Sequence, residues 1–188
     1  MRIELKLLHP SDFPLIVEWV NAYDKDFLFL WAGYTYSYPL TLEQMIQHYS
    51  HGINSVEAGV FVYKVWDKDS QEVIGTAQLG KMDSITKEAV FGRFLLKAEW
   101  YRGQGLGTRV LENIVHIAFE KFDLNRIKLN VFHTNLRAIH CYEKVGFVKG
   151  QYTENVYQSI NGEPWDRIEM VLDKELWLAK KSHAFKPF

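Results

Sequence analysis

The sequence contains little cysteine and almost no net charge. Its one cysteine, Cys141, excludes an intramolecular disulfide and a cluster of thiolate metal ligands. The 22 basic and 23 acidic residues leave a formal net charge of -1, which offers no overall basic surface to a nucleic acid or an anionic membrane. We therefore expect a cytoplasmic protein with no metal, no nucleic-acid partner and no membrane partner.

Long apolar runs are also missing. No stretch approaches the roughly 18 apolar residues that a membrane-spanning helix needs, and charged residues interrupt the start of the chain, where a signal peptide would be apolar. Hydrophobic residues nevertheless make up 47% of the 188 residues, which is enough to bury a sizeable core. These observations predict a single domain over residues 1–188.

Hydrophobic periodicity predicts alternating strands and helices. Apolar patterns indicate strands at residues 2–8, 59–66, 72–79, 88–96, 126–132, 147–159 and 165–172. Helical spacing and cap signals indicate helices at about 12–21, 41–51, 106–122 and 135–145, with a short helix in the tail. The aromatic segment 27–38 is interpreted as a loop. The predicted fold is a mixed α/β sheet, mostly antiparallel, with one parallel βαβ pairing and helices on both faces.

A glycine-rich segment joins the central strand to the long helix that follows it. It reads Arg102-Gly103-Gln104-Gly105-Leu106-Gly107-Thr108. Free amide groups at a helix start, close backbone approach at glycine and a nearby arginine are suited to binding phosphate. The segment lacks the Gly-Lys-Ser/Thr ending of a Walker loop and the spacing of a dinucleotide-binding turn. A plain helix start remains the alternative interpretation.

Two blocks of the sequence resemble one family. Residues 102–107 match the signature Gln/Arg-x-x-Gly-x-Gly/Ala of the GNAT superfamily, and residues 135–147 look like its second block, Asn-x-x-Ala-x-x-x-Tyr-x-x-x-Gly-Phe. The first helices and the aromatic segment resemble the branch of ribosomal-protein N-terminal and spermidine acetyltransferases. The turn at residues 97–101 departs from the family pattern, because it is one residue longer than usual and has no proline.

The resemblance implies a GNAT-like acyl-CoA N-acyltransferase fold and acetyl transfer from acetyl-CoA to a primary amine by direct attack in a ternary complex. It implies that the Leu95 amide stabilises the oxyanion and that Tyr142 protonates the leaving thiolate. It also implies the following cofactor-binding residues: Phe94, Leu95, Leu96, Arg102, Gly103, Gln104, Gly105, Leu106, Gly107, Thr108, Asn135, Ala138 and Tyr142.

A general base is also needed, because an alkylammonium with a pKa of about 10.4 must lose a proton before it can attack. Glu88 is the leading candidate. Period-two alternation predicts that it shares one face of its strand with Val90, Gly92, Phe94 and Leu96, with Arg93 on the other face. His133 is a second candidate. An exposed strand-end carboxylate is the plain alternative for Glu88.

Several alternatives stay open at the level of the sequence. The aromatic segment either closes one end of the core or lines a substrate pocket; anionic residues there would favour polyamines or aminoglycosides, and an aromatic slot would favour a peptide N-terminus. The protein could use another acyl donor, or it could be a non-catalytic acyl-CoA sensor or an interaction module. Exposed strands of the last hairpin are compatible with a monomer or a homodimer.

Overall fold

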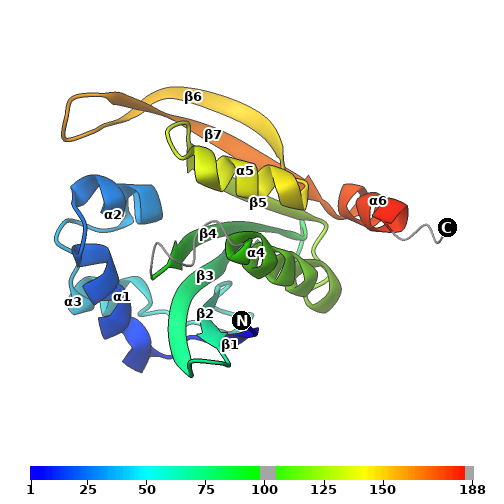
Figure 1. Cartoon of the computed structure of the whole chain (residues 1–188), viewed down its shortest axis with the longest axis horizontal. Helices are drawn as coiled ribbons and strands as arrows, with labels where there is room; N and C mark the ends of the chain where they lie inside the picture. Colours follow the sequence, from blue (N-terminus) through cyan, green and yellow to red (C-terminus); the bar gives the residue numbers. More distant parts are fainter. Residues whose placement is uncertain (98–104, 185–188) are drawn as a thin grey trace.

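The computed structural model describes residues 1–97 and 105–184. They form a seven-stranded sheet in the order β1-β2-β3-β4-β5-β7-β6 (Figure 1). The β4–β5 pair is parallel and all other neighbours are antiparallel, so the predicted mixed sheet is confirmed. The strands are β1 (Ile3–Leu7), β2 (Phe61–Asp67), β3 (Glu72–Asp83), β4 (Glu88–Leu96), β5 (Arg126–Phe132), β6 (Val148–Gln158) and β7 (Pro164–Asp173).

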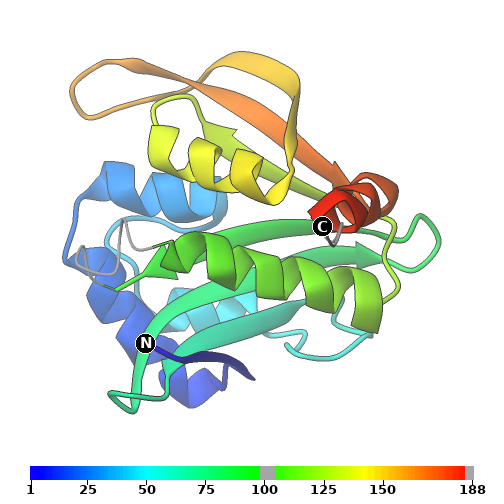
Figure 2. The same ribbon diagram turned by 45° about the vertical axis from the view of Figure 1, so that its right-hand side comes forward.

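Helices cover both faces of this sheet. The helices are α1 (Phe13–Asn21), α2 (Lys25–Ala32), α3 (Leu42–His48), α4 (Leu106–His116), α5 (Leu136–Val145) and α6 (Lys174–Ala184), with short turns η1 (Pro10–Asp12), η2 (Gly33–Thr35) and η4 (Ile117–Lys121). One hydrophobic core lies under α4 and α5, and a second lies under α1, α2 and α3. Figure 2 shows α4 crossing the sheet with α5 beside it. Within the described residues, no helix has the length and apolar character needed to cross a membrane.

Local sequence signals set several of the helix ends. The side chain of Thr41 caps α3, accepting a hydrogen bond of 3.2 Å from the Gln44 amide. The spacing of Thr41 and Gln44 in the sequence is that of a capping box, but the Gln44 side chain instead bonds the backbone of Ser37 and Pro39. Gly146 ends α5 with a φ of 119°, a backbone conformation that glycine adopts without strain.

The prediction that residues 27–38 form a loop is wrong for the first half of this segment, where α2 forms. Asp24 caps this helix by accepting a hydrogen bond of 3.0 Å from the Phe27 amide. Apolar residues stand on every side of α2, so the sequence shows no helical period even though Leu28 and Trp31 are buried. The expected tail helix is confirmed as α6, whose Trp177 packs against Phe119.

A bulge in β4 overturns the predicted face assignment. Gly92 pairs with Gln78 and Leu95 with Thr76, so β4 holds one residue more than β3 between these pairs. Arg93 has a φ of 46° there. As a result Phe94 and Leu96 pack on the α4–α5 side, whereas Leu95 turns into the core under α1 to α3. The prediction that Phe94 and Leu96 share a face with Glu88, Val90 and Gly92 is wrong, because the alternation of side chains between the two faces of the strand is interrupted at the extra residue.

Candidate active site

The site begins where β4 and β5 diverge. Their parallel register extends over only three pairs, from Glu88 opposite Arg126 to Val90 opposite Lys128. Beyond that point β4 pairs with β3, and β5 pairs with β7. The edges of β4 and β5 that face each other therefore have no strand partner among the described residues. An extended ligand with amide groups could pair with them as an added strand does.

The start of α4 lies just beyond the open end of β4. Gly105 is its N-cap residue in a left-handed conformation (φ 72°), and glycine has no side chain that could cap the helix. By contrast, α2, α3 and α5 are each capped by a side chain. The amides of Leu106, Gly107 and Thr108 therefore point out of the first turn with the positive end of the helix dipole. Arg102, Gly103 and Gln104 lie outside the described residues.

The first turn of α4 packs against both β4 and α5. A Cβ atom at Gly107 would lie 3.7 Å from the ring of Phe94 and 3.6 Å from Sγ of Cys141. The hydroxyl of Thr108 also contacts this sulfur, at 3.6 Å. Burial raises the pKa of the Cys141 thiol, so the thiol stays protonated and is a poor nucleophile.

Helix α5 brings the second sequence block to the same place. Asn135 caps this helix, accepting a hydrogen bond of 3.3 Å from the Ala138 amide. Tyr142 is 8% exposed, and its ring lies edge-on to that of Phe91 with 6.1 Å between centroids. Burial raises the pKa of the Tyr142 hydroxyl above its usual range, so this group holds its proton at neutral pH. A proton donor thus stands beside β4 near the point of divergence.

The two base candidates lie apart from the cavity described below, and Tyr142 is not among the lining residues of that cavity either. Glu88 lies where β4 and β5 are still paired, with Oε2 2.6 Å from Nζ of Lys128 and Oε1 3.5 Å from Nη1 of Arg126. His133 follows β5, and its Nδ1 accepts a hydrogen bond of 2.9 Å from the Asp166 amide. Neither side chain lines the cavity described next, so the role of each as a base stays a prediction.

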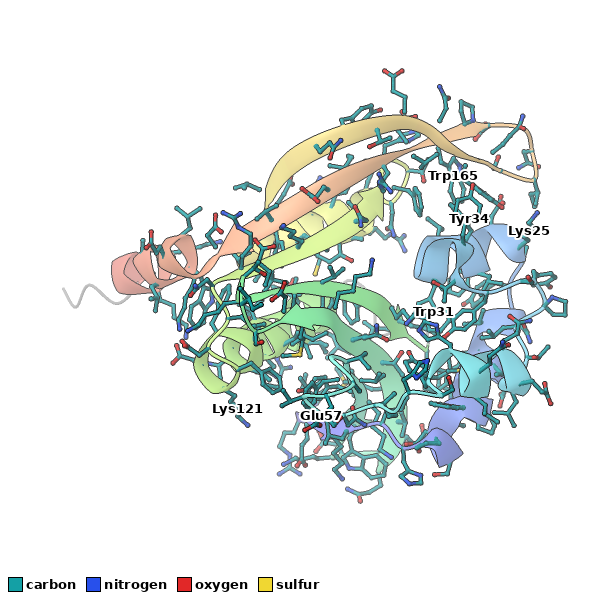
Figure 3. All side chains as sticks on the ribbon, turned by 180° about the vertical axis from the view of Figure 1, so that it is seen from behind. Lys25, Trp31, Tyr34, Glu57, Lys121 and Trp165 are labelled. Atoms are coloured by element: carbon teal, nitrogen blue, oxygen red, sulfur yellow. The ribbon has the colours of Figure 1, made fainter. Side chains whose placement is uncertain are left out.

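A cavity of about 330 Å³, here called the α2 cavity, opens between α2 and the diverging strands. In Figure 3 the labelled Trp31 and Tyr34 lie at the α2 end of the molecule, with Trp165 on the hairpin near Tyr34. The lining residues come from α2, η2, β3, β4, β5, β6 and β7: Phe29, Leu30, Trp31, Ala32, Gly33, Tyr34, Gln78, Gly80, Lys81, Val90, Phe91, Gly92, Arg93, Asn130, Phe132, Val156 and Arg167.

The aromatic segment contributes side chains both to the core, as one interpretation predicted, and to the α2 cavity; that this cavity binds the substrate stays a prediction. Leu28 belongs to the core under α1 to α3, whereas Tyr34 lines the α2 cavity. Sequence reasoning missed Lys81, Phe132 and Arg167, because the cavity forms only where β3, β4, β5 and β7 converge with α2, which no local pattern encodes. In the described part of the chain, no group of three or more His, Cys, Asp or Glu side chains is arranged to hold a metal ion.

Comparison with known proteins agrees with this architecture. Residues 16–147 match the family model described as Acetyltransferase (GNAT) family. The chain is 30% identical over 155 residues to aminoglycoside N(6')-acetyltransferase type 1 of Klebsiella pneumoniae, covering 77% of this chain and 73% of that protein. It is 25% identical over 130 residues to the putative ribosomal N-acetyltransferase YdaF of Bacillus subtilis, covering 69% and 65%.

A solved structure shows the same fold at lower identity. The spermidine N-acetyltransferase from Vibrio cholerae, in complex with CoA and spermine, superposes with a TM-score of 0.77 at 21% identity, covering 94% of this chain and 98% of that one. The diverging strands and the family match together define an acyltransferase. The chain belongs to the acetyltransferase (GNAT) family, as its two sequence blocks predicted, and it is an acetyl-CoA-dependent N-acetyltransferase.

Proposed function

We propose that this protein transfers the acetyl group of acetyl-CoA to a primary amine by direct attack in a ternary complex. The observation that carries the proposal is the divergence of β4 and β5 after Val90, which leaves an unpaired backbone edge leading to an uncapped helix start. Tyr142 stands beside this edge with its proton retained. The aminoglycoside and spermidine enzymes similar to this chain are named for amine substrates, which supports the same reaction class.

The cofactor is expected to lie along the opening. Its pantetheine arm would pair with the free edge of β4 at Phe94, Leu95 and Leu96, close to Asn135 and Ala138 of α5. Its pyrophosphate would accept hydrogen bonds at the start of α4, where an anion is favoured. The residues proposed for the pyrophosphate are Arg102, Gly103, Gln104, Gly105, Leu106, Gly107 and Thr108.

The reaction would then proceed in two stages. The amine nitrogen attacks the thioester carbonyl carbon, and the Leu95 amide stabilises the oxyanion that forms. The intermediate collapses with cleavage of the carbon–sulfur bond, and Tyr142 donates its proton to the departing sulfur. The attacking nitrogen must also lose a proton as the amide forms. Glu88 contacts two cations and lies outside the α2 cavity, so this proton would reach it only through water, and solvent would return a proton to the Tyr142 phenolate.

Calorimetric titration with acetyl-CoA, followed by a free-thiol assay with amines, tests this proposal. We expect saturable binding of acetyl-CoA, and release of CoA thiol that depends on an amine. A titration that is silent at high micromolar acetyl-CoA would contradict every role for the cofactor. Binding without thiol release from any amine would instead identify a non-catalytic sensor. Longer acyl-CoA donors in the same assay report whether the protein requires an acetyl group.

A further inference from the structure

The α2 cavity is lined by positive charge. Lys81 of β3, Arg93 of β4 and Arg167 of β7 all line it, and no aspartate or glutamate does so among the residues that the structure describes. The other polar side chains on its wall are the neutral amides of Gln78 and Asn130. A ligand inside this cavity would meet three cations that no carboxylate on the wall offsets.

Arg93 is held in place without an anionic partner. Its Nη1 donates to Gln78 Oε1 at 2.9 Å, and its Nη2 donates to Thr35 Oγ1 at 3.1 Å. The guanidinium also lies over the rings of Tyr36 and Tyr49, at 5.3 Å and 5.8 Å from their centroids. All these partners are neutral. Arg93 is half-buried, and removing part of a charge from water without a counter-ion is costly, so this position favours an anion supplied by a ligand.

Two side chains that line the α2 cavity also carry buried hydrogen-bond donors. Nε of Arg93 and Nε1 of Trp31 are both buried and have no hydrogen-bond partner among the described residues. Each of these atoms is a donor only, and because it is buried, an acceptor in the cavity reaches it only after the side chain turns. The three cations on the wall are therefore the groups that a ligand meets first.

The other two cations are also without a carboxylate partner within the described residues. Arg167 bonds the hydroxyl of Thr153, through Nη2 at 3.4 Å. The nearby carboxylate of Asp166 is occupied by the hydroxyl of Tyr152 and the amide of Asn155. By contrast, Lys64 is paired with Asp12 at 2.8 Å. Lys81 and Arg167 can therefore pair with an anion that a ligand supplies.

We propose that the amine substrate carries an anionic group, a carboxylate or a phosphate, which Arg93, Lys81 and Arg167 bind in the α2 cavity. This inference rests on the proposed acetyl transfer. The positive field would attract the anionic end of the substrate and disfavour the ammonium form of its amine, which leaves more free amine to attack. The same field would repel a polyamine, so the substrate differs from the polycations named for the similar aminoglycoside and spermidine enzymes.

Four amines of similar length test the charge requirement. They are butylamine, 1,4-diaminobutane, 4-aminobutanoate and 3-aminopropyl phosphate, assayed for thiol release at saturating acetyl-CoA. We expect kcat/KM to be at least about tenfold higher for one of the anionic amines than for butylamine, and lowest for the diamine, since a hydrogen-bonded charge contributes about this factor. The better of the two anionic compounds identifies the anion. Preference for the diamine, or equal rates for all four amines, would overturn the inference.

Variants that remove one positive charge test whether Lys81 and Arg167 bind the anionic group of the substrate. K81Q and R167Q should each lower kcat/KM for the preferred anionic amine about tenfold and change that for butylamine much less. The matched control is K121Q, because Lys121 is exposed and lies on the opposite side of the molecule from Tyr34 in Figure 3. An equal loss with butylamine, or weaker acetyl-CoA binding in K81Q and R167Q, would overturn the assignment of these cations to the substrate. Absence of acetyl-CoA binding in the wild type would instead refute the proposed function itself.

Discussion

The hydroxyl of Tyr157 on β6 donates a hydrogen bond of 2.8 Å to Oδ1 of Asp26 on α2, across 131 residues of sequence. The ring of Tyr157 also stacks on that of Phe29, with 3.6 Å between centroids. Burial and the contact with Asp26 raise the pKa of Tyr157 to about 12, so its hydroxyl is a donor at neutral pH. These contacts hold the β6–β7 hairpin against α2, and both elements form walls of the α2 cavity.

Removing this hydroxyl should loosen the cavity wall. We expect Y157F to lower the free energy of unfolding by about 1 kcal/mol, the usual net value of one hydrogen bond. It should also raise KM for the amine and leave the Kd of acetyl-CoA unchanged, because the cofactor is expected on the other side of the strands. Y38F is the control, since among the described residues the Tyr38 hydroxyl donates to the nearby backbone carbonyl of Tyr23 and not to another element of the cavity wall. Equal amine KM values for Y157F and wild type would show that the contact does not shape the site.

The central part of the fold follows from local patterns. The predicted strands at 88–96 and 126–132 coincide with β4 and β5, because β-branched and aromatic residues run through both segments. Their parallel pairing follows from the helix between them. The order β5-β7-β6 was not predicted, since the sequence does not show which strand of the final hairpin pairs with β5.

The candidate site likewise contains features that could be predicted from the sequence and features that could not. Asn135 and Gly146 act within one helix, so their cap roles could be predicted from neighbouring residues. The bulge at Arg93 could not, because arginine has no preference for a φ of 46°, and contacts from Thr35, Gln78 and Tyr49 hold the side chain there. The positive lining of the α2 cavity likewise arises only when three strands and α2 converge.

Close packing at Gly75 is expected to position Leu95. A Cβ atom at Gly75 would overlap the carbonyl oxygen of Leu95 and lie 2.8 Å from Cδ2 of Leu96. G75A should therefore push β4 away from β3, lower the free energy of unfolding by about 1–3 kcal/mol and slow acetyl transfer. At Gly92 an added Cβ meets nothing within 4 Å, so G92A should unfold at the wild-type denaturant concentration. Similar denaturation midpoints for G75A and G92A would show that the close contact between Gly75 and β4 does not limit stability.

The raised pKa of Tyr63 should make the free energy of unfolding depend on pH in the alkaline range. It is 6% exposed on β2, and burial raises its pKa to about 12 from an ordinary value of about 10. The folded state therefore keeps this proton after the unfolded chain has lost it. Stability from this group is complete below pH 10 and falls as the pH rises from 10 to 12. Denaturant titrations should show a smaller decline over this range for Y63F than for wild type, and identical slopes would exclude the raised pKa.

The proton-donor role of Tyr142 makes the most direct prediction about catalysis. Without its hydroxyl the thiolate must leave unprotonated, so Y142F should lower kcat well over tenfold, within the range of about 10² to 10⁴ known for general acids, with acetyl-CoA affinity close to wild type. Y63F is the control, because it removes another buried tyrosine hydroxyl from the same core. Since burial raises the pKa of Tyr142, kcat of the wild type should show no descending limb below pH 10. Unchanged turnover in Y142F, with chemistry shown to be rate-limiting, would remove Tyr142 from the mechanism.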